Sequence, residues 1–241
     1  MTPRAPAYRL TAVRHDYGTR TVLDVPALEI AAGETLGIVG PSGAGKSTLL
    51  RLLQFLERPS AGAIEFGGAP AAVPVPVTTA RRVTTVFQRP FMLDRSVRDN
   101  VAFGRRLRGE RADGEIDALL ERLDLAALGK ARARSLSGGE AQRAALARAI
   151  ATGAEVLLLD EPAANLDPGH VALVETVLRE QQTKGRTIVL VTHNTHEARR
   201  LATRTLFLLG GQVIELAPTA ALFDAPRDPR TRAFLAGELV Y

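Results

Sequence analysis

The sequence predicts an α/β fold in which a parallel-sheet core carries an antiparallel β subdomain and an inserted α-helical subdomain. The main observation is the order of elements in residues 155–200, where strand-like apolar stretches alternate with helical patterns. Such alternation is typical of a parallel sheet. The first 35 residues instead combine short apolar stretches with turn signals, which favours antiparallel strands. Between these regions, residues 88–134 are helical in character and therefore mark an insertion.

The elements of the N-terminal part follow from local patterns. TLGIVG (35–40) predicts a buried strand that leads into a glycine-rich loop, and KSTLLRLLQFL (46–56) has helical spacing. AGAIEFGG (61–68) predicts a hairpin, and RVTTVF (82–87) predicts another strand. Between them, APAAVPVPV (69–77) is interrupted by prolines, so we expect a surface loop or a sheet edge.

The elements of the C-terminal part alternate more regularly. EVLLLD (155–160) and TIVLVT (187–192) predict buried strands, and a helix is expected from about Glu197. TLFLLGGQVIEL (205–216) predicts a hairpin, followed by a short helical tail. In the helical insertion, Gly129 is a plausible helix end. One face of that region is apolar and contains Ile116, Leu119, Leu120 and Leu123.

The composition is typical of a globular protein, with 46% hydrophobic and 24% charged residues. No apolar run reaches the roughly 18 residues that a bilayer-spanning helix needs. The N-terminus lacks the apolar region of a signal peptide, so we expect none. Cysteine is absent, which excludes disulfides and fits a reducing compartment. We therefore expect a cytoplasmic protein.

The net charge of +5 is compatible with binding to nucleic acid or to an anionic membrane surface. Because the arginines are scattered rather than clustered, we interpret this charge as a solvated surface and expect no nucleic-acid partner. Lysine occurs only as Lys46, Lys130 and Lys184. At Lys46, a compact ammonium suits a point charge inside a phosphate-binding loop better than a planar guanidinium does.

Residues 40–48 have the pattern of a phosphate-binding loop, with a predicted strand before it and a helix after it. Glycines allow backbone N–H groups to turn toward phosphates, and the following helix N-terminus favours negative charge. In this pattern the lysine bridges the β- and γ-phosphates, and the next hydroxyl coordinates Mg²⁺. The sequence thus predicts a nucleoside triphosphate bound by Gly40, Pro41, Ser42, Gly43, Ala44, Gly45, Lys46, Ser47 and Thr48.

Hydrolysis needs more than a phosphate-binding loop: it also needs a carboxylate beside the metal ion and a group that orients the attacking water. Two adjacent acidic residues can fill these roles. Asp160 ends the apolar stretch EVLLLD, where it can hold Mg²⁺ through water. Glu161 follows directly and can polarise the attacking water. A positioned base of this kind contributes on the order of 10²–10⁴-fold to a rate.

A second glycine-rich helix start occurs in SLSGGEAQRAALARAI (135–150), far from the phosphate loop. A Ser-Gly-Gly sequence at a helix N-terminus is itself suited to bind an anion. The alternative is an ordinary glycine turn that caps a helix. Because one loop of the chain can already hold a nucleotide, this helix start is available for a second one.

Taken in order, the phosphate loop, Gln88 in VFQRP, LSGGEAQR (136–143), LLLDEP and VTH (191–193) resemble an ABC-type ATPase. The resemblance extends over nearly the whole chain. It implies a P-loop NTPase (RecA-like) core within a single domain of residues 1–241. Residues 1–87 and 154–241 would form the catalytic core with the β subdomain, and residues 88–135 the helical subdomain. It further implies a head-to-tail homodimer with ATP and Mg²⁺ as cofactors.

The resemblance also assigns roles to individual residues. The signature residues Ser137, Gly138, Gly139 and Glu140 would contact ATP held by the partner subunit. Gln88 would sense Mg²⁺ and the attacking water, so it counts as both a catalytic and a metal-binding residue. His193 would be the catalytic switch histidine near the γ-phosphate, whereas His196 is expected on a helix surface.

Two further nucleotide contacts follow from the same resemblance. Tyr17 matches the aromatic residue that stacks on adenine, although it can also be an ordinary strand aromatic. Residues 165–167, ending at Asp167, resemble the loop that crosses the dimer interface. Asn194 departs from the family pattern, because many relatives carry aspartate there. We do not expect this departure to abolish hydrolysis.

The size of the chain, without an extra domain, resembles the separate nucleotide-binding subunit of a bacterial importer. Residues 88–109 would then dock membrane permease subunits, with a solute-binding protein as an indirect partner. Such a subunit is peripheral on the inner face of the cell membrane. The tail 221–241 is most similar to ATPases of oxyanion importers, especially the tungstate type. Importers of phosphate or polar amino acids, and an ABC exporter, are the alternatives.

Overall fold

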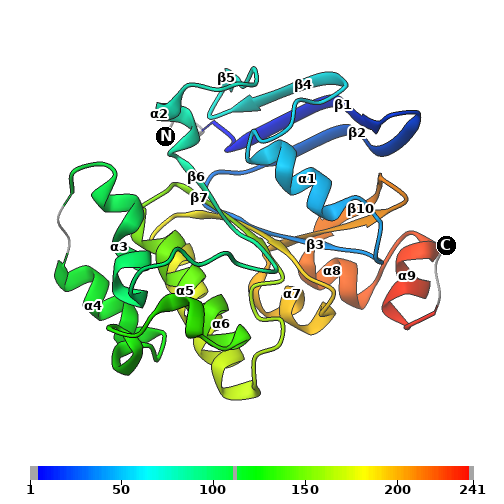
Figure 1. Ribbon diagram of the computed structural model, residues 1–241. Helices are drawn as coiled ribbons and strands as arrows, with labels where there is room; N and C mark the ends of the chain where they lie inside the picture. The colour runs from blue at the N-terminus through cyan, green and yellow to red at the C-terminus, as the bar shows by residue number, and fades with distance from the viewer. Residues whose placement is uncertain (1–4, 111–112, 239–241) are drawn as a thin grey trace.

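The computed structural model describes residues 5–110 and 113–238. In this part of the chain, one ten-stranded sheet runs through the molecule (Figure 1). The strands are β1 (Tyr8–Tyr17), β2 (Arg20–Ile30), β3 (Thr35–Val39), β4 (Ala61–Phe66), β5 (Ala69–Pro70), β6 (Val83–Val86), β7 (Val156–Asp160), β8 (Thr187–Val191), β9 (Arg204–Leu209) and β10 (Gln212–Pro218). Their order across the sheet is β5-β4-β1-β2-β10-β9-β3-β8-β7-β6.

The sheet has a parallel part and an antiparallel part. Strands β9, β3, β8, β7 and β6 run parallel to one another, with Gly37 opposite both Leu190 and Thr205. Strand β10 pairs antiparallel with β9 and parallel with β2. Strands β2, β1, β4 and β5, which we call the antiparallel arm, pair antiparallel with one another in that order across the sheet. The predicted fold class, a parallel core with an antiparallel β subdomain and helices inserted between strands, is confirmed.

The helices surround the parallel strands and also support the antiparallel arm (Figure 1). Helices α3, α4 and α5 contact one another beside the β6 edge, and α1 lies against β2. The helices are α1 (Lys46–Leu53), α2 (Val77–Ala80), α3 (Val97–Arg106), α4 (Asp113–Arg122), α5 (Gly138–Ala151), α6 (Pro168–Thr183), α7 (Thr195–Leu201), α8 (Thr219–Asp224) and α9 (Pro229–Leu235), with short 3-10 turns η1 (Ala126–Leu128) and η2 (Ala133–Ser135).

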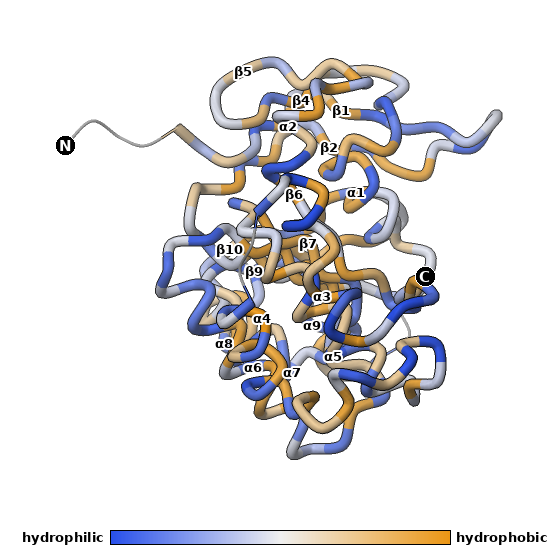
Figure 2. The backbone as a smooth tube through the Cα atoms, turned by 60° about the vertical axis from the view of Figure 1, so that its left-hand side comes forward, coloured by the Kyte–Doolittle hydropathy of each residue, from blue (hydrophilic) through white to orange (hydrophobic). Residues whose placement is uncertain are grey.

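The sheet separates the two larger of three apolar clusters in the described part of the chain. Successive side chains of a strand point to opposite faces, so Leu157 and Leu159 of β7 join the core beneath α3, α4, α5 and α6. Val156 and Leu158 join the core formed with α1 and the antiparallel arm. Figure 2 shows the apolar residues gathered in the centre of the molecule and hydrophilic residues on the outer turns. Burial on both faces explains why these strands are continuous apolar runs.

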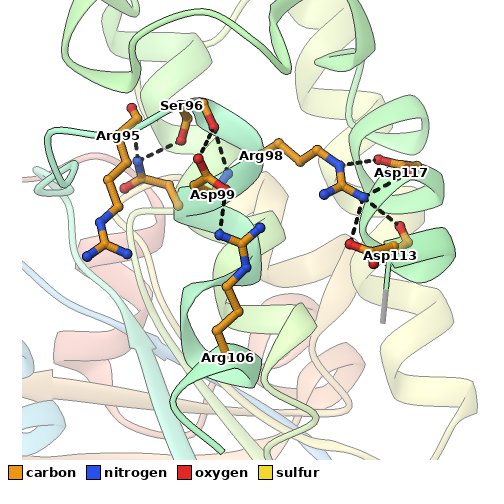
Figure 3. Close-up of polar contacts among 8 residues, drawn as sticks. Arg95, Ser96, Arg98, Asp99, Arg106, Asp113 and Asp117 are labelled. Carbon is orange, nitrogen blue, oxygen red and sulfur yellow. Dashed lines mark hydrogen bonds and ion pairs between the residues drawn. The ribbon is translucent and has the colours of Figure 1, made fainter. Parts of the chain in front are cut away.

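Ion pairs join α3 to α4 at the outside of the helical region (Figure 3). The Arg98 guanidinium donates to Asp117 at 2.7 Å and to Asp113 at 3.0 Å. These hydrogen bonds raise the pKa of Arg98 above its ordinary value. Ser96 caps the start of α3 by accepting a hydrogen bond from the Asp99 backbone N–H. Because the ion pairs are exposed, each contributes little to the free energy of unfolding.

Two helix ends differ from the sequence expectation. The helix expected over residues 46–56 ends at Leu53, and Phe55 then takes a positive φ of 62°. Gly129 ends a helix only as the C-cap of the short 3-10 turn η1, whereas the longer helix α4 already stops at Arg122. Asp124 adopts a φ of 52° and turns the chain after α4. Both corrections arise from left-handed residues other than glycine, which glycine-based signals do not mark.

Candidate nucleotide-binding and catalytic site

The phosphate loop connects the buried strand β3 to α1, and its glycines are required by geometry. A Cβ at Gly40 would lie 2.1 Å from the carbonyl oxygen of Leu208. Gly43 and Gly45 adopt positive φ values of 79° and 98°. These conformations are open to glycine and costly for other residues. The loop can therefore curl tightly and direct its backbone N–H groups inward.

The N-terminus of α1 differs from most other helix starts in the described part of the chain. Its N-cap is Gly45, with no side-chain cap and no acidic residue in the first turn. Side chains cap α3, α5, α6, α7 and α9 by accepting backbone hydrogen bonds. The partial positive charge of α1 is therefore not offset by its own chain, which suits an anionic ligand.

Lys46 and Asp160 lie at this loop in a partly buried setting. The Lys46 ammonium donates to the carbonyl oxygens of Gly40 at 2.7 Å and Pro41 at 2.8 Å. Burial lowers the pKa of Lys46, while the carboxylates of Glu161 and Asp160 oppose that change. Burial raises the pKa of Asp160, and a hydrogen bond from Ser47 opposes it.

Strand β7 places the predicted metal-side carboxylate beside the phosphate loop. The Ser47 hydroxyl donates to Asp160 Oδ2 at 3.1 Å. These two residues lie far apart in the sequence, at the start of α1 and at the end of β7. A hydroxyl and a carboxylate side by side form an oxygen pair of the kind that hard divalent cations bind.

Glu161 is held in a constrained position directly after β7. It is buried and adopts a φ of 54°, which costs energy for a residue other than glycine. Glu161 Oε1 accepts a hydrogen bond from the His193 backbone N–H at 3.0 Å. Glu161 Oε2 lies 2.6 Å from His193 Nδ1. The structure therefore brings the predicted base and the predicted switch histidine into contact at the ends of β7 and β8.

Gln88 and Gln142 occupy contrasting positions near this base. Gln88 follows β6 and is exposed, and its side chain has no hydrogen-bond partner within residues 5–110 and 113–238. Gln142 of α5 is buried and donates to the carbonyl oxygens of Phe87 at 3.5 Å and Glu161 at 3.4 Å. Gln142 is a site residue that the sequence analysis missed. It lies within LSGGEAQR, but its partners come from other elements, so the sequence carries no signal of these contacts.

The signature residues form a separate helix start. Ser137 caps α5 in a capping box with Glu140, and these hydrogen bonds lower the pKa of Glu140. A Cβ at Gly138 would meet nothing within 4 Å, whereas one at Gly139 would lie 3.0 Å from Leu166 Cδ2. No hydrogen bond or ion pair of the described chain joins residues 137–140 to the phosphate loop.

The two remaining predicted nucleotide contacts have partners within the chain. Tyr17 is partly exposed at the end of β1; its hydroxyl donates to Glu57 at 2.7 Å and accepts from Arg51 at 3.0 Å. Arg51 belongs to α1, which places the tyrosine near the helix that leaves the phosphate loop. Asp167 caps α6 by accepting from the His170 backbone N–H at 3.1 Å. His196 is exposed on α7, as expected.

Comparison with known proteins gives a consistent result. A family profile described as "ABC transporter" matches residues 23–164. The phosphate import ATP-binding protein PstB 2 of Natronomonas pharaonis is 40% identical, over 96% of this chain and 87% of its own length. The tungstate uptake system ATP-binding protein TupC of Peptoclostridium acidaminophilum is 38% identical, over 84% of this chain and 94% of its own length.

Among solved structures, cbiO1 from Clostridium perfringens, part of the ABC transporter complex cbiONQ, superposes with a TM-score of 0.80. It is 26% identical, and the match covers 96% of this chain and 95% of that one. The fold and the site thus define an ATPase with a phosphate loop. The chain belongs to the ABC transporter family and is an ATP-binding, ATP-hydrolysing subunit of that family.

Proposed function

We propose that this chain is the ATPase subunit of an importer for a tetrahedral oxyanion of the tungstate or phosphate class, working as a head-to-tail homodimer on a permease. The observation that carries the ATPase arrangement is the presence of two glycine-containing helix starts in one chain, of which only the second, at α5, is capped by its own side chains. Helix α1 has no side-chain cap, and Gly138 at the start of α5 faces open space. The transport part is supported by PstB 2 and TupC, which are named for phosphate import and tungstate uptake.

Mg²⁺ fits the residues beside the phosphate loop. Ser47 and Asp160 offer a hydroxyl and a carboxylate oxygen within hydrogen-bond distance of each other. In residues 5–110 and 113–238, no group of three or more His, Cys, Asp or Glu side chains could hold a metal ion. The ion would therefore be held by Ser47, by Asp160 through water, by Gln88 and by phosphate oxygens. When bound, it neutralises charge on the transferring phosphate.

The chain's own groups then divide the work of hydrolysis. Lys46 presents its ammonium to the β- and γ-phosphates, in place of the Gly40 and Pro41 carbonyl oxygens it contacts here. Glu161 Oε2 accepts a proton from the attacking water, and the His193 backbone N–H fixes the other carboxylate oxygen at 3.0 Å. Because the His193 side chain is exposed, it can leave its 2.6 Å contact with Glu161 Oε2 and turn toward a γ-phosphate, which opens that oxygen to the water.

The second helix start serves the ATP of a partner subunit in this proposal. Within its own chain, Gly138 has no neighbour that requires a glycine, since a Cβ there meets open space. A phosphate that approaches from outside the chain would require glycine at this position, because only glycine lets the backbone come close to the phosphate. Ser137, Gly139, Glu140 and Asp167 would line the same contact. Tyr17 would stack on the adenine of the chain's own ATP.

The segment 88–109 is the proposed docking surface for the permease. Phe91 is 68% exposed, and its carbonyl oxygen accepts from Arg148 of α5 at 3.0 Å. The segment thus connects an exposed aromatic side chain to the helix that begins with the signature residues. No helix of the described chain is long and apolar enough to cross a membrane. In the proposal, the chain is peripheral on the inner face of the membrane, and a solute-binding protein is an indirect partner.

Copurification tests the transport proposal. Tagged protein is recovered from native membranes in mild detergent, and the accompanying proteins are identified. We expect a multi-span permease whose associated solute-binding protein binds tungstate or phosphate in direct titration. Binding of a polar amino acid instead would replace the proposed solute. A permease with a large extracytoplasmic domain and no binding protein would indicate export.

A further inference from the structure

His170 lies between two carboxylates that belong to different parts of the fold. Its Nδ1 atom is 2.5 Å from Asp167 Oδ2, and its Nε2 atom is 3.2 Å from Asp124 Oδ2. Asp167 ends the loop 165–167 and caps α6, whereas Asp124 follows α4 in the helical region. The ring therefore spans the two regions with both nitrogens in contact. We call Asp167, His170 and Asp124 the histidine bridge.

The histidine bridge continues into the helix that carries the signature residues. The Asp124 carbonyl oxygen accepts from Arg143 Nη1 at 2.9 Å, and the same nitrogen donates to the Leu123 carbonyl oxygen at 2.7 Å. Arg143 is buried on α5, which begins at Gly138. A chain of polar contacts thus runs from the signature helix through Asp124 and His170 to the loop 165–167.

A second, apolar contact joins the same two segments. A Cβ at Gly139 would lie 3.0 Å from Leu166 Cδ2, so the loop 165–167 packs directly against the start of α5. Asn165 precedes this contact with a φ of 62°, and the bend turns Leu166 toward the helix. The loop is therefore held by Leu166 on one side and by the histidine bridge on the other.

The charge around His170 favours a protonated ring. The groups that face it are the carboxylates of Asp167, Asp124 and Glu140 and the guanidinium of Arg143. Hydrogen bonds that the ring donates to Asp167 and then to Asp124 raise the pKa of His170 above its ordinary value of 6.5, and burial and the charge of Arg143 oppose them. A protonated ring donates from both nitrogens, whereas a neutral ring has one N–H and can donate to only one carboxylate.

We propose that His170 is a positioning residue for ATP hydrolysis, which in its protonated form fastens the loop 165–167 to the signature helix through Asp124 and Arg143. The proposal rests on the proposed function, in which these two segments meet the ATP of the partner subunit. Because the folded state holds the proton more tightly, the two-sided bridge is complete at acidic pH. It is lost as the pH rises through the raised pKa of His170.

The test compares the turnover number (kcat) of His170→Gln with that of the parent as a function of pH. Dividing the kcat of the variant by that of the parent at each pH removes the pH dependence that the two proteins share. We expect the variant to be about fivefold slower at about pH 6 and to approach the parent at about pH 9, with unchanged nucleotide affinity in the monomer. His196→Gln, which removes an exposed histidine outside the bridge, is the matched control and should give a ratio near unity throughout.

Asp124→Asn provides a second variant that keeps the shape of the bridge, because asparagine tolerates the positive φ at this position. It should show the same slowing at acidic pH and the same convergence at alkaline pH. A variant-to-parent ratio that is equal at every pH would overturn the proposal, since a merely structural role gives that result. If the parent itself forms no ATP-dependent dimer and hydrolyses no ATP, the proposed function fails instead. In that case the histidine bridge is tested by NMR titration of the His170 ring. A pKa at or below 6.5 would refute the bridge.

Discussion

Replacing Glu161 by glutamine removes a proton acceptor while keeping the shape of the side chain. The variant's Oε1 can still accept from the His193 backbone N–H, which is 3.0 Å from Glu161 Oε1 in the parent. What is lost is the charge opposite His193 Nδ1, a contact of 2.6 Å in which the histidine side chain is 72% exposed. A polar contact with one exposed partner contributes up to about 1 kcal/mol, so the free energy of unfolding should change by no more than that.

The effect on catalysis should be far larger. Loss of a general base lowers a turnover number on the order of 10²–10⁴-fold, while ATP binding at the phosphate loop is retained. The assays are phosphate release at saturating ATP, titration with a fluorescent ATP analogue, and gel filtration with ATP, where a trapped dimer should accumulate. Glu180→Gln, which removes a half-buried carboxylate of α6 paired with Arg122, is the control and should keep parental activity. Hydrolysis by Glu161→Gln at the parent rate would refute the role assigned to this residue.

The other site residues give separable outcomes. Lys46→Ala should weaken nucleotide binding by about 10–100-fold in a titration, and unchanged affinity would remove it from the phosphate site. Gly40→Ala should lower the free energy of unfolding in urea by about 1–3 kcal/mol, because its Cβ would lie 2.1 Å from the Leu208 carbonyl oxygen; an unchanged midpoint would contradict this. Gly138→Ala should keep stability within about 0.5 kcal/mol while slowing hydrolysis, so parental activity would count against an external ligand at that position. Gln142→Ala should lower kcat without weakening ATP binding, and the reverse pattern would contradict its place beside Glu161.

Much of the fold could be predicted because the parallel strands are buried on both faces. Residues 155–160 and 187–192 are short apolar runs for this reason, and each ends where a polar site residue begins. The ends of elements were harder to predict. Phe55 and Asp124 adopt positive φ values that their side chains do not signal, so α1 and the segment after α4 end differently from expectation.

The candidate site could be predicted only in part, because some of its residues act through contacts that sequence spacing does not reveal. The phosphate loop and Asp160 could be found from local pattern, since each lies next to its own strand. Gln142 and His170 could not, because their partners come from other elements, such as the Phe87 and Glu161 carbonyl oxygens for Gln142. Their roles depend on how α5 and α6 pack beside the sheet.

Mixing two inactive variants tests the central claim most directly, namely that one chain binds ATP at its phosphate loop and completes the site of its partner with its signature residues. Lys46→Ala damages the first element, and Ser137→Arg damages the second. Each purified variant alone should be inactive. In a mixed dimer, the intact phosphate loop of one subunit meets the intact signature of the other, so we expect hydrolysis to return on mixing. If the two variants bind each other and the mixture still hydrolyses no ATP, the phosphate loop and the signature residues do not act across the subunit interface.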